Sequence, residues 1–235
     1  LMSVLNILFV GSDGVARSIA KKSDSRDVDN YVYKDLKEDG TFSTISILRP
    51  NNYPEKPKPF FTSLTVSDFG IIEVNKVDAV FGEVIVSMAC AGINDGLIII
   101  NPSEGEWVDD SQVKTLVEQA GLSDWKFIEN EGVTVREKLI GVLNQIEAKD
   151  ENGFVVAVDQ AFTVKGVGLV AVGHVQSGRV NKHDDVVFAG SDGNAIARSL
   201  QVMDLDVEVA NVGDRVGLAL RTAGDFREDI LGKGS

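Results

Sequence analysis

The sequence has few of the residues from which disulfides and common metal sites are built. Its 235 residues include one cysteine and two histidines. A single cysteine excludes an internal disulfide and a cysteine-cluster metal site, and nothing supplies a third ligand to His174 and His183 at a characteristic spacing. Cys90 stands among small apolar residues, so we expect it to pack as a core residue on a buried helix face.

Long apolar runs and an excess of positive charge are also missing. No stretch is long and apolar enough to cross a membrane, and residues 1–10 lack the basic start of a signal peptide. The sequence therefore predicts a cytoplasmic protein with no membrane partner. Lysine and arginine total 23 against 36 aspartates and glutamates, a net charge of −13. This balance argues against strong autonomous nucleic-acid binding, which usually needs a basic face, but it leaves room for a local patch.

The strongest basic grouping is short. It consists of Arg17, Lys21, Lys22 and Arg26, which we interpret as a solvated surface. Hydrolase signatures such as Gly-x-Ser-x-Gly or a cysteine–histidine pair are absent.

The first part of the chain alternates strand-like and helix-like patterns. Apolar runs at 5–10, 69–74 and 96–101 are typical of strands buried on both faces. A turn after residue 10 leads into helical character over 15–22, and residues 51–59, with three of the five prolines, are expected to form a loop. The alternation predicts an α/β domain of the P-loop-NTPase-like type, with a parallel sheet covered on both faces.

The pattern changes after a charged segment at 147–152. From residue 154 onward, short strand-like runs are separated by glycine-containing turns, and no helix is evident. This spacing predicts an all-β barrel or sandwich. We therefore expect two domains, covering residues 1–148 and 153–235.

The turn after the first strand carries a candidate nucleotide-binding loop. A P-loop reads G-x-x-x-x-G-K-[ST], in which backbone amides wrap the phosphates, the lysine meets the outer phosphates and the hydroxyl binds magnesium. Gly11 and Ser18 fit this pattern, but Ala16 replaces the second glycine and Arg17 replaces the lysine. On these residues we expect loss of tight nucleotide binding. The candidate residues are Gly11, Ser12, Asp13, Gly14, Val15, Ala16, Arg17 and Ser18.

A second string resembles a guanine-reading motif by its letters alone. Asn75-Lys76-Val77-Asp78 matches Asn-Lys-x-Asp, but two further strand–helix units follow it, whereas in GTPases the string comes later. We interpret this match as a coincidence.

The glycines and valines from Asp159 onward form a more specific pattern. The segment 159–180 resembles F-x-I-x-G-x-G-x-V-V-x-G-x-V-x-x-G, and 210–221 resembles A-x-A-G-x-x-V-G-L-x-L-R, with Glu228-Asp229-Ile230 similar to E-D-I-x-x-G. The matching positions in the first segment are Phe162, Val164, Gly166, Gly168, Val170, Gly173, Val175 and Gly178. The segment is similar to the second domain of the elongation factor Tu, elongation factor 1α and selenocysteine-specific factor family, which implies a domain-2-like β-barrel.

This resemblance implies that the first domain derives from a GTPase domain of translation. Asp78 then falls near the magnesium-holding aspartate of D-x-x-G, and Ser18 and Asp78 would hold the metal if GTP and magnesium bind. No histidine follows to position water, and Asn130 to Val133, where the guanine string should stand, lacks both lysine and aspartate. The resemblance therefore implies a degenerate GTPase domain, with catalysis lost.

Three functions remain open at this point. The first is a translation elongation factor-like protein that acts as a non-catalytic binding or regulatory module beside tRNA, the ribosome or another translation factor. The second is a working GTPase with an unusual P-loop, and the third is a protein-interaction scaffold unrelated to translation. In this family the second barrel helps to hold the acceptor end of charged tRNA, which makes His174, Arg179 and Arg221 candidate contacts. A third barrel normally follows it in the family.

Overall fold

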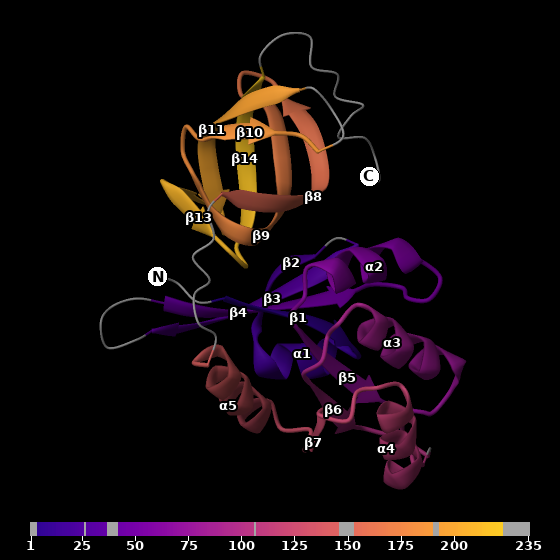
Figure 1. The fold of residues 1–235 in the computed structure, drawn as a ribbon. Coiled ribbons are helices and arrows are strands. Elements are labelled where there is room, and N and C mark those ends of the chain that lie inside the picture. The colour runs from indigo at the N-terminus through magenta and orange to yellow at the C-terminus, as the bar shows by residue number, and fades with distance from the viewer. Residues whose placement is uncertain are drawn as a thin grey trace. The chain divides into compact units, whose positions relative to one another are not determined.

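The computed structural model describes residues 4–25, 27–36, 42–105, 107–145, 153–189 and 193–222. The chain divides into two compact units, Leu1–Glu147 and Ala148–Ser235 (Figure 1). Three features of the sequence lie outside the described residues: Arg26, the charged segment at 147–152 and the Glu228-Asp229-Ile230 motif. Each unit is considered by itself.

The first unit is built on a seven-stranded, mostly parallel sheet with the order β2-β3-β4-β1-β5-β6-β7. The strands from β4 to β7 on this path pair in parallel, whereas β2 and β3 add an antiparallel hairpin beside β4. This arrangement confirms the predicted α/β fold. The strands are β1 (Val4–Val10), β2 (Lys21–Ser25), β3 (Val28–Leu36), β4 (Phe42–Pro50), β5 (Phe69–Val74), β6 (Gly96–Ile100) and β7 (Lys126–Ile128).

Helices cover both faces of this sheet, and on each face they pack against the strands in a separate apolar cluster. Val15 and Ile19 of α1 and Leu139 of α5 belong to one cluster. Phe60 of α2, Met88 of α3, and residues of α4 belong to the other. The helices are α1 (Asp13–Ile19), α2 (Pro57–Thr65), α3 (Ala79–Cys90), α4 (Asp110–Gln119) and α5 (Gly132–Leu143).

A tryptophan explains two glycines of the sheet. Gly70 of β5 and Gly96 of β6 are direct partners in the ladder. A Cβ on either glycine would come within 2.3 and 2.4 Å of ring atoms of Trp125, so the indole takes the space of two side chains. Its Nε1 donates to the Ile93 carbonyl at 3.3 Å, which holds the ring over the first residues of β5 and β6.

Several local predictions are corrected. Cys90 is exposed, because it is the last residue of α3, whereas Met88 of the same helix is buried. The proline-rich stretch is a loop only as far as Lys56, since Pro57 begins α2 at a position where a missing amide hydrogen costs nothing. The helix expected over 15–22 ends at Ile19, and Lys21 starts β2.

The second unit is antiparallel throughout its described strands, which confirms the predicted all-β class; closure into a barrel stays a prediction. The order is β10-β11-β14-β9-β13, with β8 paired to β9 and β12 paired to β11. Its core is rich in valine, leucine and alanine, including Ala171, Val180 and Val216. The strands are β8 (Phe154–Val164), β9 (Gly168–Asn181), β10 (Asp185–Val187), β11 (Asn194–Val202), β12 (Leu205–Val207), β13 (Val209–Asn211) and β14 (Arg215–Thr222).

Two glycines of β9 allow β8 to pass very close to it. A Cβ on Gly173 would come within 2.2 Å of the Ala157 carbonyl oxygen. Gly178 has a φ of +66°, and its Cβ would come within 1.7 Å of the Gly153 oxygen. At these two positions, the glycine of the pattern that carried the family resemblance therefore has a steric cause.

None of the helices in the described part of the chain is long and apolar enough to span a bilayer.

Candidate ligand-binding edge of the α/β unit

The parallel strands bring a set of polar residues to one edge of the first sheet. Gly11 follows β1, Arg49 stands near the end of β4, Glu73 near the end of β5, and Asn101 directly follows β6. In open α/β sheets, ligands bind in the crevice at the carboxyl ends of the strands. This edge is therefore the place to look for a nucleotide site.

The predicted nucleotide-binding loop is a short turn followed directly by a helix. Ser12 is the N-cap of α1, and its hydroxyl accepts from the Val15 amide at 3.3 Å, so that Gly11 and Ser12 alone join β1 to the helix. The helix therefore begins at Asp13, two residues earlier than the expected start at residue 15, because Ser12 caps it. The other candidate residues lie on α1: Asp13, Gly14, Val15, Ala16, Arg17 and Ser18.

A buried glutamate accepts a hydrogen bond from a backbone amide of this turn. The Ser12 amide donates to Oε2 of Glu73 at 2.5 Å, and Nδ2 of Asn101 donates to Oε1 at 2.6 Å. Glu73 is 6% exposed, and a Cβ on Gly11 would come within 2.6 Å of its Cβ. Asn75 completes the group by donating to the Asn101 carbonyl at 2.9 Å. The amide of the N-cap residue of α1 is thus already bonded to an internal carboxylate.

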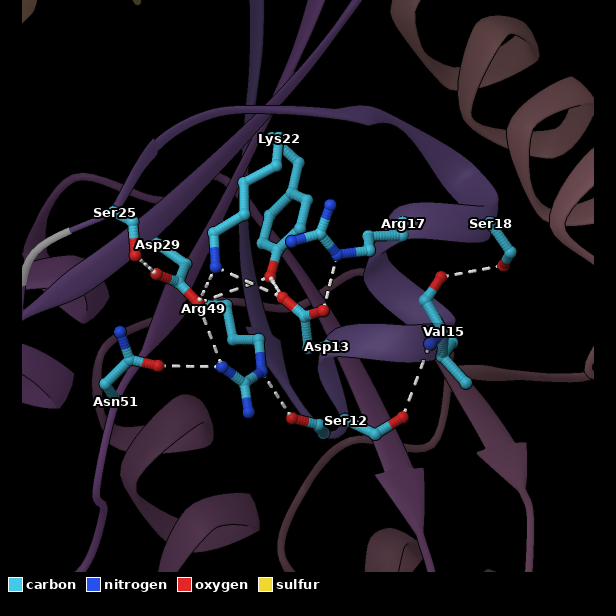
Figure 2. Close-up of polar contacts among 12 residues, drawn as sticks. Ser12, Asp13, Val15, Arg17, Ser18, Lys22, Ser25, Asp29, Arg49 and Asn51 are labelled. Carbon is cyan, nitrogen blue, oxygen red and sulfur yellow. Dashed lines mark hydrogen bonds and ion pairs between the residues drawn. The ribbon is translucent and has the colours of Figure 1, made fainter.

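Asp13, on the first turn of α1, holds three further donors (Figure 2). Its Oδ1 accepts from the Tyr31 hydroxyl at 2.6 Å and from Lys22 Nζ at 3.2 Å, and its Oδ2 accepts from Arg17 Nε at 2.5 Å. The Tyr31 hydroxyl, followed by Arg17, holds the pKa of the Asp13 carboxyl well below its usual range. Asp13 is therefore ionised and already bonded.

Asp29 forms a second, more buried acidic centre beside it (Figure 2). It accepts from Lys22 Nζ at 2.7 Å, from the Ser25 hydroxyl at 2.7 Å and from Arg49 Nη1 at 3.1 Å. Burial raises the pKa of Asp29, but hydrogen bonds from Lys22 and Ser25 outweigh burial and lower it overall. Arg49 also donates from Nε to the Gly11 carbonyl at 2.7 Å, so it ties the β1–α1 turn to β4.

The residues expected to meet phosphate and magnesium are engaged within their own helices. The Arg17 side chain is 55% exposed and pairs with Asp13 one turn away. The Ser18 hydroxyl donates to the Val15 carbonyl at 2.7 Å. Asp78 caps α3 by accepting from the Phe81 amide at 3.0 Å, and its ion pair with Lys76, followed by that amide, lowers its pKa.

The two guanine-string candidates also have local roles. Asn75 bonds within the Glu73 group, while Lys76 and Asp78 pair with each other at 2.9 Å. The segment from Asn130 to Val133 leads into α5, where a Cβ on Gly132 would come within 2.3 Å of the Ser18 carbonyl oxygen. This stretch therefore serves the contact between α5 and the end of α1. Among the described residues, no group of three or more histidine, cysteine or acidic side chains could hold a metal ion.

Comparison with known proteins gives the ancestry. No family model matches the chain. An uncharacterised protein of Methanocaldococcus jannaschii is 33% identical over 215 residues, which is 91% of this chain and 66% of that protein. The selenocysteine-specific elongation factor of Escherichia coli is 31% identical over 130 residues, which is 53% of this chain and 21% of the factor. A crystal structure of a bacterial selenocysteine-specific elongation factor matches 94% of this chain and 42% of its own, with a TM-score of 0.73 at 17% identity.

The chain is related to the translational GTPases. This relationship confirms the resemblance drawn from the glycines and valines beyond Asp159. The chain spans less than two thirds of the relatives with which it was compared, so activities and partners of the whole factors do not pass to it directly.

The candidate tRNA contacts of this translational GTPase relative lie on β9 and β14. Arg179 and Arg221 are exposed. We expected His174 at the surface, but it is buried, with 3% of it exposed, and it lies opposite Arg215 in the ladder. Burial, followed by the charge of Arg215, lowers its pKa to about 3, so the ring is neutral at physiological pH. Arg215 in turn pairs with Asp159 at 2.7 Å.

Sequence reasoning missed Glu73, Arg49 and Asn101, on which this edge depends. Glu73 was visible as the single charged residue in the apolar run of β5, and Asn101 as the polar residue that ends the run of β6. What the sequence could not show is that they meet the turn after β1, since Ser12 and Glu73 are 61 positions apart.

Proposed function

We propose that this chain is a translation elongation factor-like protein whose GTPase-like unit is a non-catalytic binding or regulatory module. The observation that carries this proposal is the hydrogen bond from the Ser12 amide to the buried Glu73 carboxylate. A bound phosphate would have to displace that carboxylate or lie beside it, and two negative groups at one site repel each other. The residues at this edge therefore do not fit GTP and magnesium in the way that the resemblance implies.

Three further observations support the proposal. The turn between β1 and α1 is too short to wrap a phosphate, Arg17 is paired outward on the helix, and the Ser18 hydroxyl is bonded to its own helix. A magnesium-bound nucleotide would need each of these groups in another arrangement. The relationship to elongation factors supports tRNA, the ribosome or another translation factor as the partner, and the cytoplasm as its place of action.

Nucleotide titration tests the first half of this proposal. Fluorescent GTP, GDP and ATP are titrated into the chain with magnesium, with unlabelled nucleotide as competitor. We expect no saturable, competable signal up to millimolar nucleotide. Saturable binding of one nucleotide per chain, lost when magnesium is removed, would instead establish a working nucleotide site with an unusual P-loop.

Co-sedimentation with ribosomes and gel shift with aminoacylated tRNA test the second half. At low salt we expect one of these partners to bind, and binding to weaken when Arg179 and Arg221 are both changed to alanine. The matched control is the double variant Arg198→Ala, Lys165→Ala, because both are exposed cations of the same unit and the same net charge is removed. If neither partner binds, the scaffold without a link to translation becomes the better reading.

A further inference from the structure

A positively lined pocket of about 470 Å³ lies in the α/β unit, away from the Glu73 group. The end of α1, the β2–β3 hairpin and the first turns of α5 contribute to it. Five of its nine lining residues are basic, which is unexpected in a chain of net charge −13. These are Arg17, Lys21, Lys22, Lys34 and Arg136, with Tyr33 beside them.

Two of these cations are already balanced by an acid. Arg17 and Lys22 both contact Asp13, and Lys22 also contacts Asp29. They shape one wall of the pocket and contribute less to its net charge.

Arg136 is held differently. Its Nε donates to the Ile19 carbonyl at 2.6 Å and its Nη2 to the Ser18 carbonyl at 2.9 Å. Its guanidinium carbon lies 4.9 Å from the centre of the Tyr33 ring, within the range of a cation–π contact. Carbonyls and a ring orient the guanidinium without cancelling its charge, so the positive charge is available and preorganised.

Lys21 adds a second such charge. It is exposed, and none of the carboxylates in the described ranges lies within ion-pair distance of it. No acidic residue lines the pocket. The site therefore presents an uncompensated positive potential from two sides, from β2 and from α5.

The size and the donors together indicate the class of ligand. A volume of about 470 Å³ is within the range of small-molecule sites. Arginine forks and lysine ammonium groups are the usual protein donors to phosphate oxygens. We propose that this pocket binds a small phosphorylated molecule. This goes beyond the proposed function and does not depend on it, and it gives the basic grouping around Arg17 and Lys21 a role other than a solvated surface.

The first test uses inorganic tripolyphosphate, which carries phosphates but no base. Isothermal titration calorimetry on the full chain at low salt should show saturable binding at one site. The double variant Lys21→Ala, Lys34→Ala should weaken binding by at least about tenfold, since charge-assisted hydrogen bonds are lost. Both lysines are exposed, so unchanged circular dichroism and unfolding curves are expected to confirm an intact fold.

The matched control is Lys126→Ala, Lys138→Ala, which removes the same net charge from exposed positions outside the pocket. We expect its affinity to stay within about twofold of the parent at constant ionic strength. An equal loss in both double variants, or no saturation at millimolar tripolyphosphate, overturns the site.

Two further arms separate this pocket from other phosphate sites. NMR shift mapping of the backbone amides locates the anion: tripolyphosphate should shift the amides of Lys21, Lys34 and Arg136, which line the pocket. Shifts confined to Gly11 and Ser12 would place the anion at the sheet edge instead. A short RNA oligonucleotide is then added as competitor. RNA that binds more tightly than tripolyphosphate and is lost in the Lys21, Lys34 variant overturns the small-molecule assignment.

Discussion

The two units of this chain keep different parts of the translational GTPase pattern. In the antiparallel unit the glycines are retained, and at Gly173 and Gly178 a Cβ would overlap a carbonyl oxygen of the β8 side. In the α/β unit the strands and helices are retained, but residues at the nucleotide-binding motifs differ from the family's pattern. The comparison separates two kinds of residue: the role of the glycines is steric and can be read from the backbone, whereas the role of the altered residues depends on a ligand and has to be tested.

The largest expected effect comes from filling the closest approach in the antiparallel unit. Gly178→Ala combines a φ of +66° with a Cβ 1.7 Å from the Gly153 oxygen. We expect a loss of about 3–5 kcal/mol in the free energy of unfolding, because strain and overlap add. Hydrogen exchange of the β8 and β9 amides measures it within this unit. Both tryptophans, Trp107 and Trp125, belong to the other unit, so their fluorescence reports there instead.

Gly166→Ala is the control for backbone conformation alone. Gly166 has a φ of +83°, but no atom lies within 4 Å of the added Cβ. We expect a cost of about 1–2 kcal/mol. Equal costs at both glycines would mean that close approach does not explain the retained pattern.

The second prediction concerns the carboxylate at the ligand edge of the α/β unit. Glu73→Gln keeps the shape but turns one acceptor oxygen into a donor, which then faces the Ser12 amide or Asn101 Nδ2. We expect a loss of about 2 kcal/mol, because a buried donor is left unsatisfied. Urea unfolding followed by tryptophan fluorescence measures it.

Glu118→Gln serves as the comparison, since Glu118 is a half-exposed residue of α4 whose ion pair with Lys114 is long, at 4.0 Å. Its effect should be within about 0.5 kcal/mol of zero. If Glu73→Gln is equally harmless, the edge does not depend on its internal carboxylate, and the main support for a non-nucleotide role is removed.

The third prediction uses pH to examine the antiparallel unit. His174 has its pKa lowered to about 3 by burial and by Arg215, against 6.5 when unfolded. Below pH 6.5 the unfolded chain binds a proton that the folded chain does not, so stability falls as the pH falls from 6.5 towards 3. At pH 5 the interval of 1.5 units corresponds to about 2 kcal/mol, at about 1.36 kcal/mol for each unit.

His174→Leu should remove this part of the pH dependence. The measurement is the free energy of unfolding at pH 7, 6 and 5 for both proteins, and the difference between their slopes isolates His174. Asp214, whose pKa burial raises, titrates in both proteins and cancels from the difference. Parallel slopes would show that His174 becomes protonated in the folded chain.

The fold could be predicted from the sequence where one pattern decides the element. β5 and β6 are uninterrupted apolar runs, and the turn glycines between β8 and β9 mark a hairpin. β2 could not be predicted, because its sequence KKSDS is wholly polar and it is a strand only through its pairing with β3 at the sheet edge. α2 was hidden by the prolines that begin it.

The candidate site was less predictable than the fold. The substitutions at Ala16 and Arg17 drew attention to α1, but they could not show that α1 begins directly after Ser12. The glutamate that meets the Ser12 amide lies on another strand, and register between distant strands is a property of the sheet. Local patterns identify elements, whereas the chemistry at an edge depends on which elements become neighbours.

The smallest expected effect concerns Arg17 of the α/β unit, which stands where the P-loop pattern has a lysine. Arg17→Ala removes an exposed partner of Asp13, and Tyr31 and Lys22 still donate to that carboxylate. We expect the urea midpoint to stay unchanged within error, since exposed helix pairs contribute little and Asp13 keeps its buried-side donors. Arg17→Lys, which restores the family's letter, should likewise confer no GTP binding, because the turn before α1 remains short and Glu73 still accepts from Ser12. Measurable GTP affinity in Arg17→Lys would show that one letter, rather than the architecture of the edge, separates this unit from a working GTPase.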